Sequence, residues 1–138
     1  MLMAHGSPRR INEFLWESMC PDAFLSHLLR DAEADILFVT HTGIPWKRRL
    51  PDGRLVVNVG AIGRPANDGK TTVDYALVEV TDEDVEVSFV PVAYDHQRLA
   101  EEMRSEKLPE EFVETVLTGW WTTCLEVLPA KERARGTY

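Results

Sequence analysis

Apolar residues occur in short runs that are separated by turn-forming residues, and one run stands out because it passes directly into a polar segment. Residues 36–39 are all apolar, and Thr40-His41-Thr42-Gly43 follows without a linker. A short apolar run with polar flanks predicts a buried strand. Side chains that follow such a strand lie at its carboxyl end, where α/β proteins build their sites. We therefore expect residues 35–46 to organise the fold.

A second strand and a helix precede this run. Residues 2–4 are apolar and pass into the turn-forming His5-Gly6-Ser7-Pro8, while apolar residues recur at helical spacing between Asp22 and Ala32. The pattern predicts a helix of about three turns, with Asp22 as its cap. A strand, a helix and a strand in this order predict a right-handed parallel crossover. His5 and His41 would then lie at neighbouring strand ends.

The remainder of the chain alternates between strand and helix patterns. Residues 54–59 predict a strand that ends in a glycine loop, and residues 71–80 and 85–92 predict an antiparallel hairpin with one wet face. Residues 96–108 and 110–117 predict two helices, separated by Pro109. The cluster Lys47-Arg48-Arg49 is expected to be a solvated loop. The fold class is therefore α/β (α+β), with a mixed sheet and helices.

Length and charge narrow the possible functions. The 138 residues predict one domain, and 15 Lys plus Arg against 23 Asp plus Glu give a net charge of -8. That charge argues against nucleic acid and anionic membrane as stable partners. The chain shows no apolar run of the roughly 18 residues that a membrane helix needs, no secretory leader, and no metal or redox spacing of its two cysteines. We expect a cytoplasmic protein.

The histidines that follow the two strands are the candidate functional residues. Neutral imidazole is the commonest ligand of transition metals, so His5 and His41 at adjacent strand ends could form half of a metal site. The alternative is that each is a hydrogen-bonded structural group. Residues alone leave both readings open, and they assign no catalytic residue.

Four stretches carry a resemblance to a known family. They are His5-Gly6-Ser7-Pro8 with the following residues 9–13, the THTGIP run at 40–45, residues 58–65 (NVGAIGRP), and Tyr94-Asp95 through Leu108-Pro109-Glu110-Glu111-Phe112. In order and spacing they are similar to the HGSP, GHTHxP, NPGSxGxP and YD...LPEEF signatures of the calcineurin-like metallophosphoesterases, in particular of their small single-domain bacterial and archaeal members.

The resemblance implies a four-layer αββα sandwich in which two metal ions, about 3.5–4 Å apart, hydrolyse a phosphate ester. His5 and His41 would be ligands of the same divalent metal, which could be Mn, Fe, Zn or Ni. Gly43 stands where the family has its last histidine ligand. The family's DxH, GD and GNH motifs have no counterpart, so residues 1–138 resemble the second, C-terminal half of such a domain and lack the bridging carboxylate.

Three functions follow from this resemblance and stay open. The chain is a phosphoesterase acting on a small phosphoester, either truncated or paired with another chain that carries the missing ligands. Alternatively it is a non-catalytic binding module derived from that fold. In the third case it is an interaction protein whose uncovered sheet is buried in a homo-oligomer or by a partner chain, because open apolar sheet edges promote association.

Overall fold

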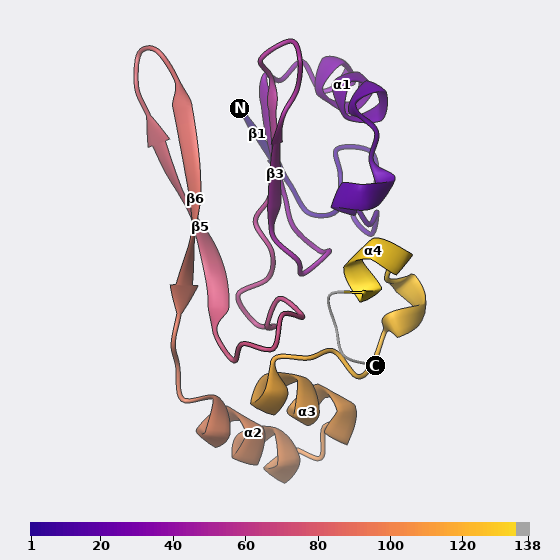
Figure 1. Cartoon of the computed structure of the whole chain (residues 1–138), viewed down its shortest axis with the longest axis vertical. Helices are drawn as coiled ribbons and strands as arrows, with labels where there is room; N and C mark the ends of the chain where they lie inside the picture. Colours follow the sequence, from indigo (N-terminus) through magenta and orange to yellow (C-terminus); the bar gives the residue numbers. More distant parts are fainter. Residues whose placement is uncertain (135–138) are drawn as a thin grey trace.

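The computed structural model describes residues 1–134, which form a mixed α+β fold (Figure 1). The strands are β1 (Leu2–Ala4), β2 (Ile36–Val39), β3 (Trp46–Arg49), β4 (Leu55–Asn58), β5 (Val73–Val80) and β6 (Val85–Val92). The α-helices are α1 (Asp22–Asp31), α2 (His96–Ser105), α3 (Glu110–Thr118) and α4 (Ala130–Arg133), and short 3-10 turns occupy Glu17–Met19 and Leu125–Val127. The fold class is the one that the sequence predicts.

Four strands form a mixed sheet in the order β1-β2-β4-β3. The first three are parallel, with Ala4 opposite Val39 and Val39 opposite Asn58. The residues that follow these three strands therefore leave the sheet at the same edge. Helix α1 connects β1 to β2, as predicted, although Pro21 rather than Asp22 occupies its cap position.

The prediction of a solvated loop at residues 47–49 is wrong, because these residues belong to β3, which pairs antiparallel with β4. Trp46 opens the strand with its ring buried. The Arg48 guanidinium donates hydrogen bonds to the backbone carbonyls of Glu17 at 2.6 Å and Cys20 at 2.5 Å. Two backbone carbonyls and the Asp22 carboxylate, whose oxygen lies 3.2 Å from the guanidinium, therefore hold the charge of Arg48, which composition alone does not reveal.

The two faces of the sheet are covered by different layers. Helix α1 covers one face with Leu25, Leu28 and Leu29, all fully buried. The hairpin β5-β6 covers the other face, where Phe38 and Val87 belong to one apolar cluster. Figure 1 shows the hairpin and α1 on opposite sides of the sheet. The hairpin pairing confirms the prediction for residues 71–92.

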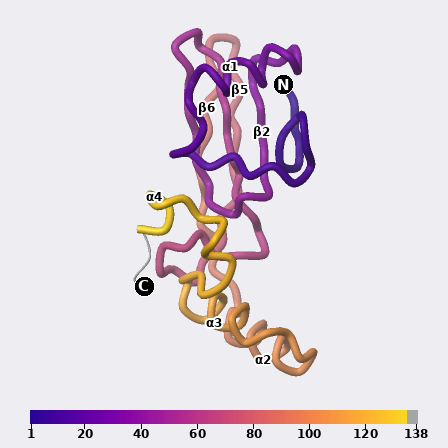
Figure 2. The backbone as a smooth tube through the Cα atoms, turned by 90° about the vertical axis from the view of Figure 1, so that its right-hand side faces the viewer, coloured from indigo at the N-terminus to yellow at the C-terminus, as the bar shows by residue number. Residues whose placement is uncertain are grey.

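The C-terminal segment leaves the hairpin, forms α2 and α3, and returns toward the sheet, as Figure 2 shows. Asp95 caps α2 by accepting a hydrogen bond from the Arg98 backbone N–H, and Gly119 ends α3 in the left-handed conformation. The buried Glu132 carboxylate on α4 accepts a hydrogen bond at 3.0 Å from the Ser18 backbone N–H. Within residues 1–134, every helix is too short or too polar to span a bilayer.

Candidate metal centre

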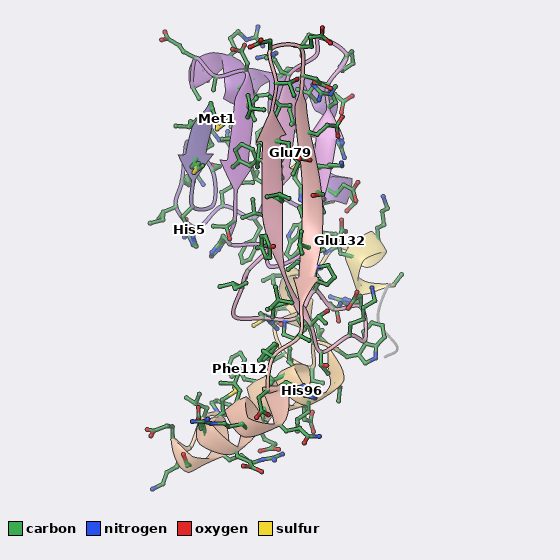
Figure 3. All side chains as sticks on the ribbon, turned by 90° about the vertical axis from the view of Figure 1, so that its left-hand side faces the viewer. Met1, His5, Glu79, His96, Phe112 and Glu132 are labelled. Atoms are coloured by element: carbon green, nitrogen blue, oxygen red, sulfur yellow. The ribbon has the colours of Figure 1, made fainter. Side chains whose placement is uncertain are left out.

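The two candidate histidines meet at the carboxyl edge of the sheet. His5 directly follows β1, and His41 lies two residues beyond the end of β2. The Nε2 atom of His5 is 3.1 Å from the Nδ1 atom of His41, and the ring planes are inclined by 68°. Figure 3 shows His5 at the tip of its strand. The parallel crossover therefore brings together two residues that are 36 positions apart in sequence.

The backbone of His41 adopts a left-handed conformation, with φ of +79°. Such angles are uncommon for residues other than glycine, and they cluster where the surrounding structure holds a functional group in place. Here the Thr40 hydroxyl donates a hydrogen bond to the Gly60 carbonyl, and the Val59 N–H donates to the Val39 carbonyl at 2.8 Å. The loop of residues 40–43 is thereby fastened to the loop that follows β4.

A buried network of hydrogen bonds holds the loop of residues 40–43 in place. The fully buried Asn58 amide donates a hydrogen bond to the Thr42 hydroxyl and accepts one at 3.0 Å from the Gly60 N–H. The Leu15 carbonyl accepts from Thr42 and Asn58 at 3.4 Å and from the Trp46 indole N–H at 2.9 Å. Sequence reasoning placed Asn58 at the start of the stretch 58–65 but assigned it no supporting role, although an amide that ends the run Leu-Val-Val was a possible signal.

The loop that carries His5 is a tight turn of its own. Gly6 has φ of +75°, and a Cβ atom there would collide with the carbonyls of Arg10 and Ile11, so only glycine fits. The Ser7 hydroxyl accepts hydrogen bonds at 3.1 Å from the N–H groups of Arg9 and Arg10 and donates one to Glu13. His5 is therefore exposed on a closed turn rather than on a loose segment.

The environment of His41 favours a neutral imidazole. Burial, and then the neighbouring His5, lower the pKa of His41 below its ordinary value of 6.5. The Nε2 atom of His41 is buried and has no hydrogen-bond partner among the described residues. A neutral imidazole is the form that binds metal ions, so the electrostatics suit a ligand.

The spacing of the two nitrogens can be tested against a bound ion. Two nitrogens that each lie about 2.1 Å from one zinc-like ion are separated by about 3.0–3.4 Å for ligand angles between a right angle and the tetrahedral value. The observed 3.1 Å falls in this range, and it also suits an N–H···N hydrogen bond between the rings. In the described part of the chain, no group of three or more His, Cys, Asp and Glu side chains is placed to hold a metal ion. The pair fits two positions of a coordination shell.

Comparisons with known proteins show which known fold the chain resembles. No model of a protein family matches the chain. An uncharacterized protein of Methanocaldococcus jannaschii, MJ0912, is 24% identical over 133 residues, which cover 86% of this chain and 51% of that protein. The crystal structure of the hypothetical protein PH1004 from Pyrococcus horikoshii superposes with a TM-score of 0.68 at 27% identity, over 85% of this chain and 45% of that one.

A crystal structure of a metallophosphoesterase from Sphaerobacter thermophilus superposes with a TM-score of 0.63 at 26% identity, over 85% of this chain and 55% of that protein. The chain has a metallophosphoesterase-like fold. It spans about half the length of each of the three proteins named here. The likeness concerns the fold, and the role of His5 and His41 as ligands stays a prediction.

Position 43 of this metallophosphoesterase-like fold is closed by an aromatic ring. Gly43 has φ of +77°, and a Cβ atom built on it would lie 3.0 Å from the Trp121 ring. Trp121 is buried, and its indole N–H donates to the Pro65 carbonyl at 2.7 Å while its backbone N–H donates to the Asn67 side chain at 2.9 Å. The space beside Gly43 is therefore filled by the ring of Trp121.

Other polar and turn residues of the chain lie outside the histidine pair. The guanidinium of Arg64 lies 3.6 Å above the Trp121 ring, and Gly60 has a positive φ, as expected for turn residues in this loop. His27 is exposed on α1, with its Nδ1 atom 3.2 Å from an Asp31 oxygen. Arg64, Gly60 and His27 therefore do not join the site at which His5 and His41 converge.

Proposed function

We propose that this chain supplies two imidazole ligands to one divalent metal ion, in a metallophosphoesterase-like site whose reaction is the metal-dependent hydrolysis of a small phosphate ester. The observation that carries the proposal is the convergence of His5 Nε2 and His41 Nδ1 at 3.1 Å, at the carboxyl ends of the parallel strands β1 and β2. The fold shared with the Sphaerobacter metallophosphoesterase supports it.

Each histidine has a distinct part in holding the ion. His5 would bind through Nε2 and His41 through Nδ1, which leaves the proton of neutral His41 on its buried Nε2 atom. The Asn58 and Thr42 network fixes the backbone that carries His41, so its ring needs little reorganisation on binding. A bound ion of this kind supplies Lewis acidity and lowers the pKa of a bound water. Imidazole suits Mn, Fe, Zn and Ni to different degrees, and Zn or Ni best among them.

Hydrolysis needs more ligands than residues 1–134 bring together. Two neutral imidazoles leave most positions of a divalent ion to water, and no carboxylate joins the pair in the described chain. We therefore expect weak metal binding by the 138-residue chain and no turnover by it alone. Catalysis belongs to a site that is completed by additional acidic ligands.

A non-catalytic binding module is the second candidate function. The contact between Trp121 and Gly43 favours it, because the indole occupies the space that a side chain at position 43 would need. The resemblance places a histidine that binds the second metal ion at that position. A site without that ligand holds one ion in place of two, and such a site can bind without hydrolysing.

Calorimetric titration of the chain with Ni²⁺ tests metal binding by His5 and His41, which both candidate functions require. We expect one weak site, and we expect His5→Ala and His41→Ala each to reduce the affinity by roughly tenfold or more, because each removes a direct ligand. His27→Ala is the matched control, since this imidazole is exposed on α1, and its affinity should change by less than about twofold. Unchanged Ni²⁺ affinity in both His5→Ala and His41→Ala would contradict the proposal.

A fusion separates the two candidates. The portion of the Sphaerobacter metallophosphoesterase that the structural match leaves uncovered is joined ahead of Met1, and hydrolysis of bis(4-nitrophenyl) phosphate is followed with Mn²⁺. The enzyme proposal expects hydrolysis that His5→Ala abolishes. A fusion that binds Mn²⁺ with a defined stoichiometry and hydrolyses nothing favours the non-catalytic module.

A further inference from the structure

The ring of Phe14 lies beside the imidazole of His41. The two ring centroids are 4.5 Å apart, and the ring planes are inclined by 40°. Phe14 also stacks on Trp16, with the centroids 5.5 Å apart and the planes 3° from parallel. Trp16 is buried in an apolar cluster with Ile44 and Trp121. Phe14 is therefore held between a buried tryptophan and a candidate metal ligand.

Burial in the core does not account for an aromatic residue at position 14. Phe14 is 40% exposed, whereas the neighbouring Leu15 and Trp16 are buried. Its backbone is nevertheless tied to the histidine loop, because the Leu15 carbonyl accepts a hydrogen bond from the Thr42 hydroxyl at 3.4 Å and Thr42 follows His41 directly. An exposed ring that is fixed against an imidazole indicates a role toward the imidazole rather than toward the core.

The outer nitrogen of the His41 ring lacks an ordinary hydrogen-bond partner. Its Nδ1 atom faces Nε2 of His5 at 3.1 Å, while its Nε2 atom is buried and has no partner among residues 1–134. A neutral imidazole that offers the lone pair of Nδ1 to a metal ion carries its proton on Nε2. A buried N–H without an acceptor costs free energy, and metal-binding histidines ordinarily donate this hydrogen to a carboxylate, a carbonyl or water. The face of an aromatic ring is a weaker acceptor for the same hydrogen.

We propose that Phe14 is a positioning residue of the candidate metal centre, whose ring accepts the Nε2–H of His41 in an N–H···π hydrogen bond and so keeps Nδ1 as the ligand atom. The ligand role of Nδ1 rests on the proposed function, whereas the N–H···π bond belongs to the metal-free chain. The centroid distance lies at the short end of the range for interacting aromatic rings. Since Nδ1 faces His5, Nε2 is the nitrogen of His41 that remains to donate.

Apolar cover alone is the competing explanation of this contact. In that case Phe14 only keeps water away from His41, and another apolar side chain of similar size serves equally well. The two explanations differ in what they expect of Phe14→Leu, because leucine provides apolar cover and has no aromatic face. Phe14→Tyr retains the aromatic face and is the conservative variant that should restore the wild-type behaviour.

NMR of the ¹⁵N-labelled, metal-free chain in EDTA tests the N–H···π bond. We expect an observable His41 Nε2–H resonance, because a buried N–H exchanges slowly with water, and we expect the Phe14 ring current to shift it upfield. Its absence in His41→Gln assigns it. Phe14→Tyr should keep the upfield shift, Phe14→Leu should keep the resonance without the shift, and Phe14→Ala should lose the resonance through exchange with solvent.

Titration with Ni²⁺ tests the positioning role. We expect Phe14→Leu to lower the Ni²⁺ affinity by about threefold or more and Phe14→Tyr to restore it to within about twofold, because partners of a histidine ligand's second nitrogen support metal binding. Phe112→Leu is the matched control, since Phe112 is 39% exposed and lies on α3, away from His5 in Figure 3. Its Ni²⁺ affinity and the His41 N–H resonance should stay as in the wild type.

Two results would overturn the assignment of Phe14. A His41 N–H resonance at the same position in the wild type and in Phe14→Leu would show that the aromatic face accepts no hydrogen. An Ni²⁺ affinity that Phe14→Leu leaves unchanged would show that Phe14 does not position the ligand. A wild-type chain that shows the upfield-shifted N–H and binds no Ni²⁺ would confirm the N–H···π bond and refute the proposed function, so the two failures are distinguishable.

Discussion

The two sides of the layered structure differ in the side-chain contacts that join the sheet to the hairpin. On the side of β3 and β6, Lys47 Nζ donates to the Val87 carbonyl at 2.6 Å and Arg49 donates to the Val85 carbonyl at 2.9 Å. Long cationic side chains thus bridge the two layers and cover the core. On the side of β1 and β5, the residues that line the cleft between the layers include Met3, Ala4, Ala76 and Val78, which are small or apolar, and within residues 1–134 no lysine or arginine side chain lines this cleft. The side that carries the histidines is the side without a cover.

The largest effect on stability is expected on the side of β3 and β6, which we call the bridged side because Lys47 and Arg49 there contact the hairpin. Val87→Asp places a carboxylate in the cluster of Phe38 and Leu55, and we expect a loss of at least about 3 kcal/mol in the free energy of unfolding, because a buried charge has no partner there. Urea unfolding followed by tryptophan fluorescence measures it. The same substitution at Met3 should cost less than about 0.5 kcal/mol in the isolated chain. Equal losses at the two positions would remove the contrast between the sides.

An intermediate effect is expected at the bridge itself. Lys47→Met keeps the apolar stem and removes the ammonium group, so the Val87 carbonyl loses its charged donor. We expect about 1 kcal/mol less stability and faster amide exchange in β6, since a partly buried hydrogen bond contributes about that amount. Exchange that speeds up equally in β1 would show that the loss is global rather than confined to the bridged side.

The smallest effect is expected at the exposed end of the same side. Arg49→Gln removes the ion pair with Asp84, whose N···O distance is 2.9 Å and whose side chains are 45% and 51% exposed. Solvent screens such pairs, so we expect a change of about 0.5 kcal/mol or less in the free energy of unfolding. Urea midpoints in low and high salt check this, and a loss larger than that of Lys47→Met would reverse the order.

The sequence predicts most strands, the hairpin and three of the α-helices because their apolar patterns are long enough to be periodic. It misses β3, since Trp46-Lys47-Arg48-Arg49 has one apolar residue and its cations are satisfied by carbonyls and carboxylates that are distant in sequence. It also misses α4, whose buried Glu132 depends on a contact with Ser18. Long-range partners of charged residues leave no local pattern.

The candidate site is predictable to a similar extent. Strand order brings His5 and His41 to adjacent strand ends, so topology alone predicts their proximity. The contact between Gly43 and the Trp121 ring is not predictable, because the tryptophan lies 78 positions farther along the chain. The role of Asn58 as a support depends likewise on Leu15 and Thr42 meeting it in space.

The carbonyl of Leu15 has a consequence for the mutational robustness of the histidine loop. Three separate side chains end on this one oxygen, and a main-chain atom persists whatever residue occupies position 15. Replacing the Leu15 side chain therefore leaves the acceptor chemically intact, whereas the donors can be lost only one at a time. An amide-to-ester exchange does not delete this oxygen either, so the anchor of the loop is encoded in backbone rather than in residue identity.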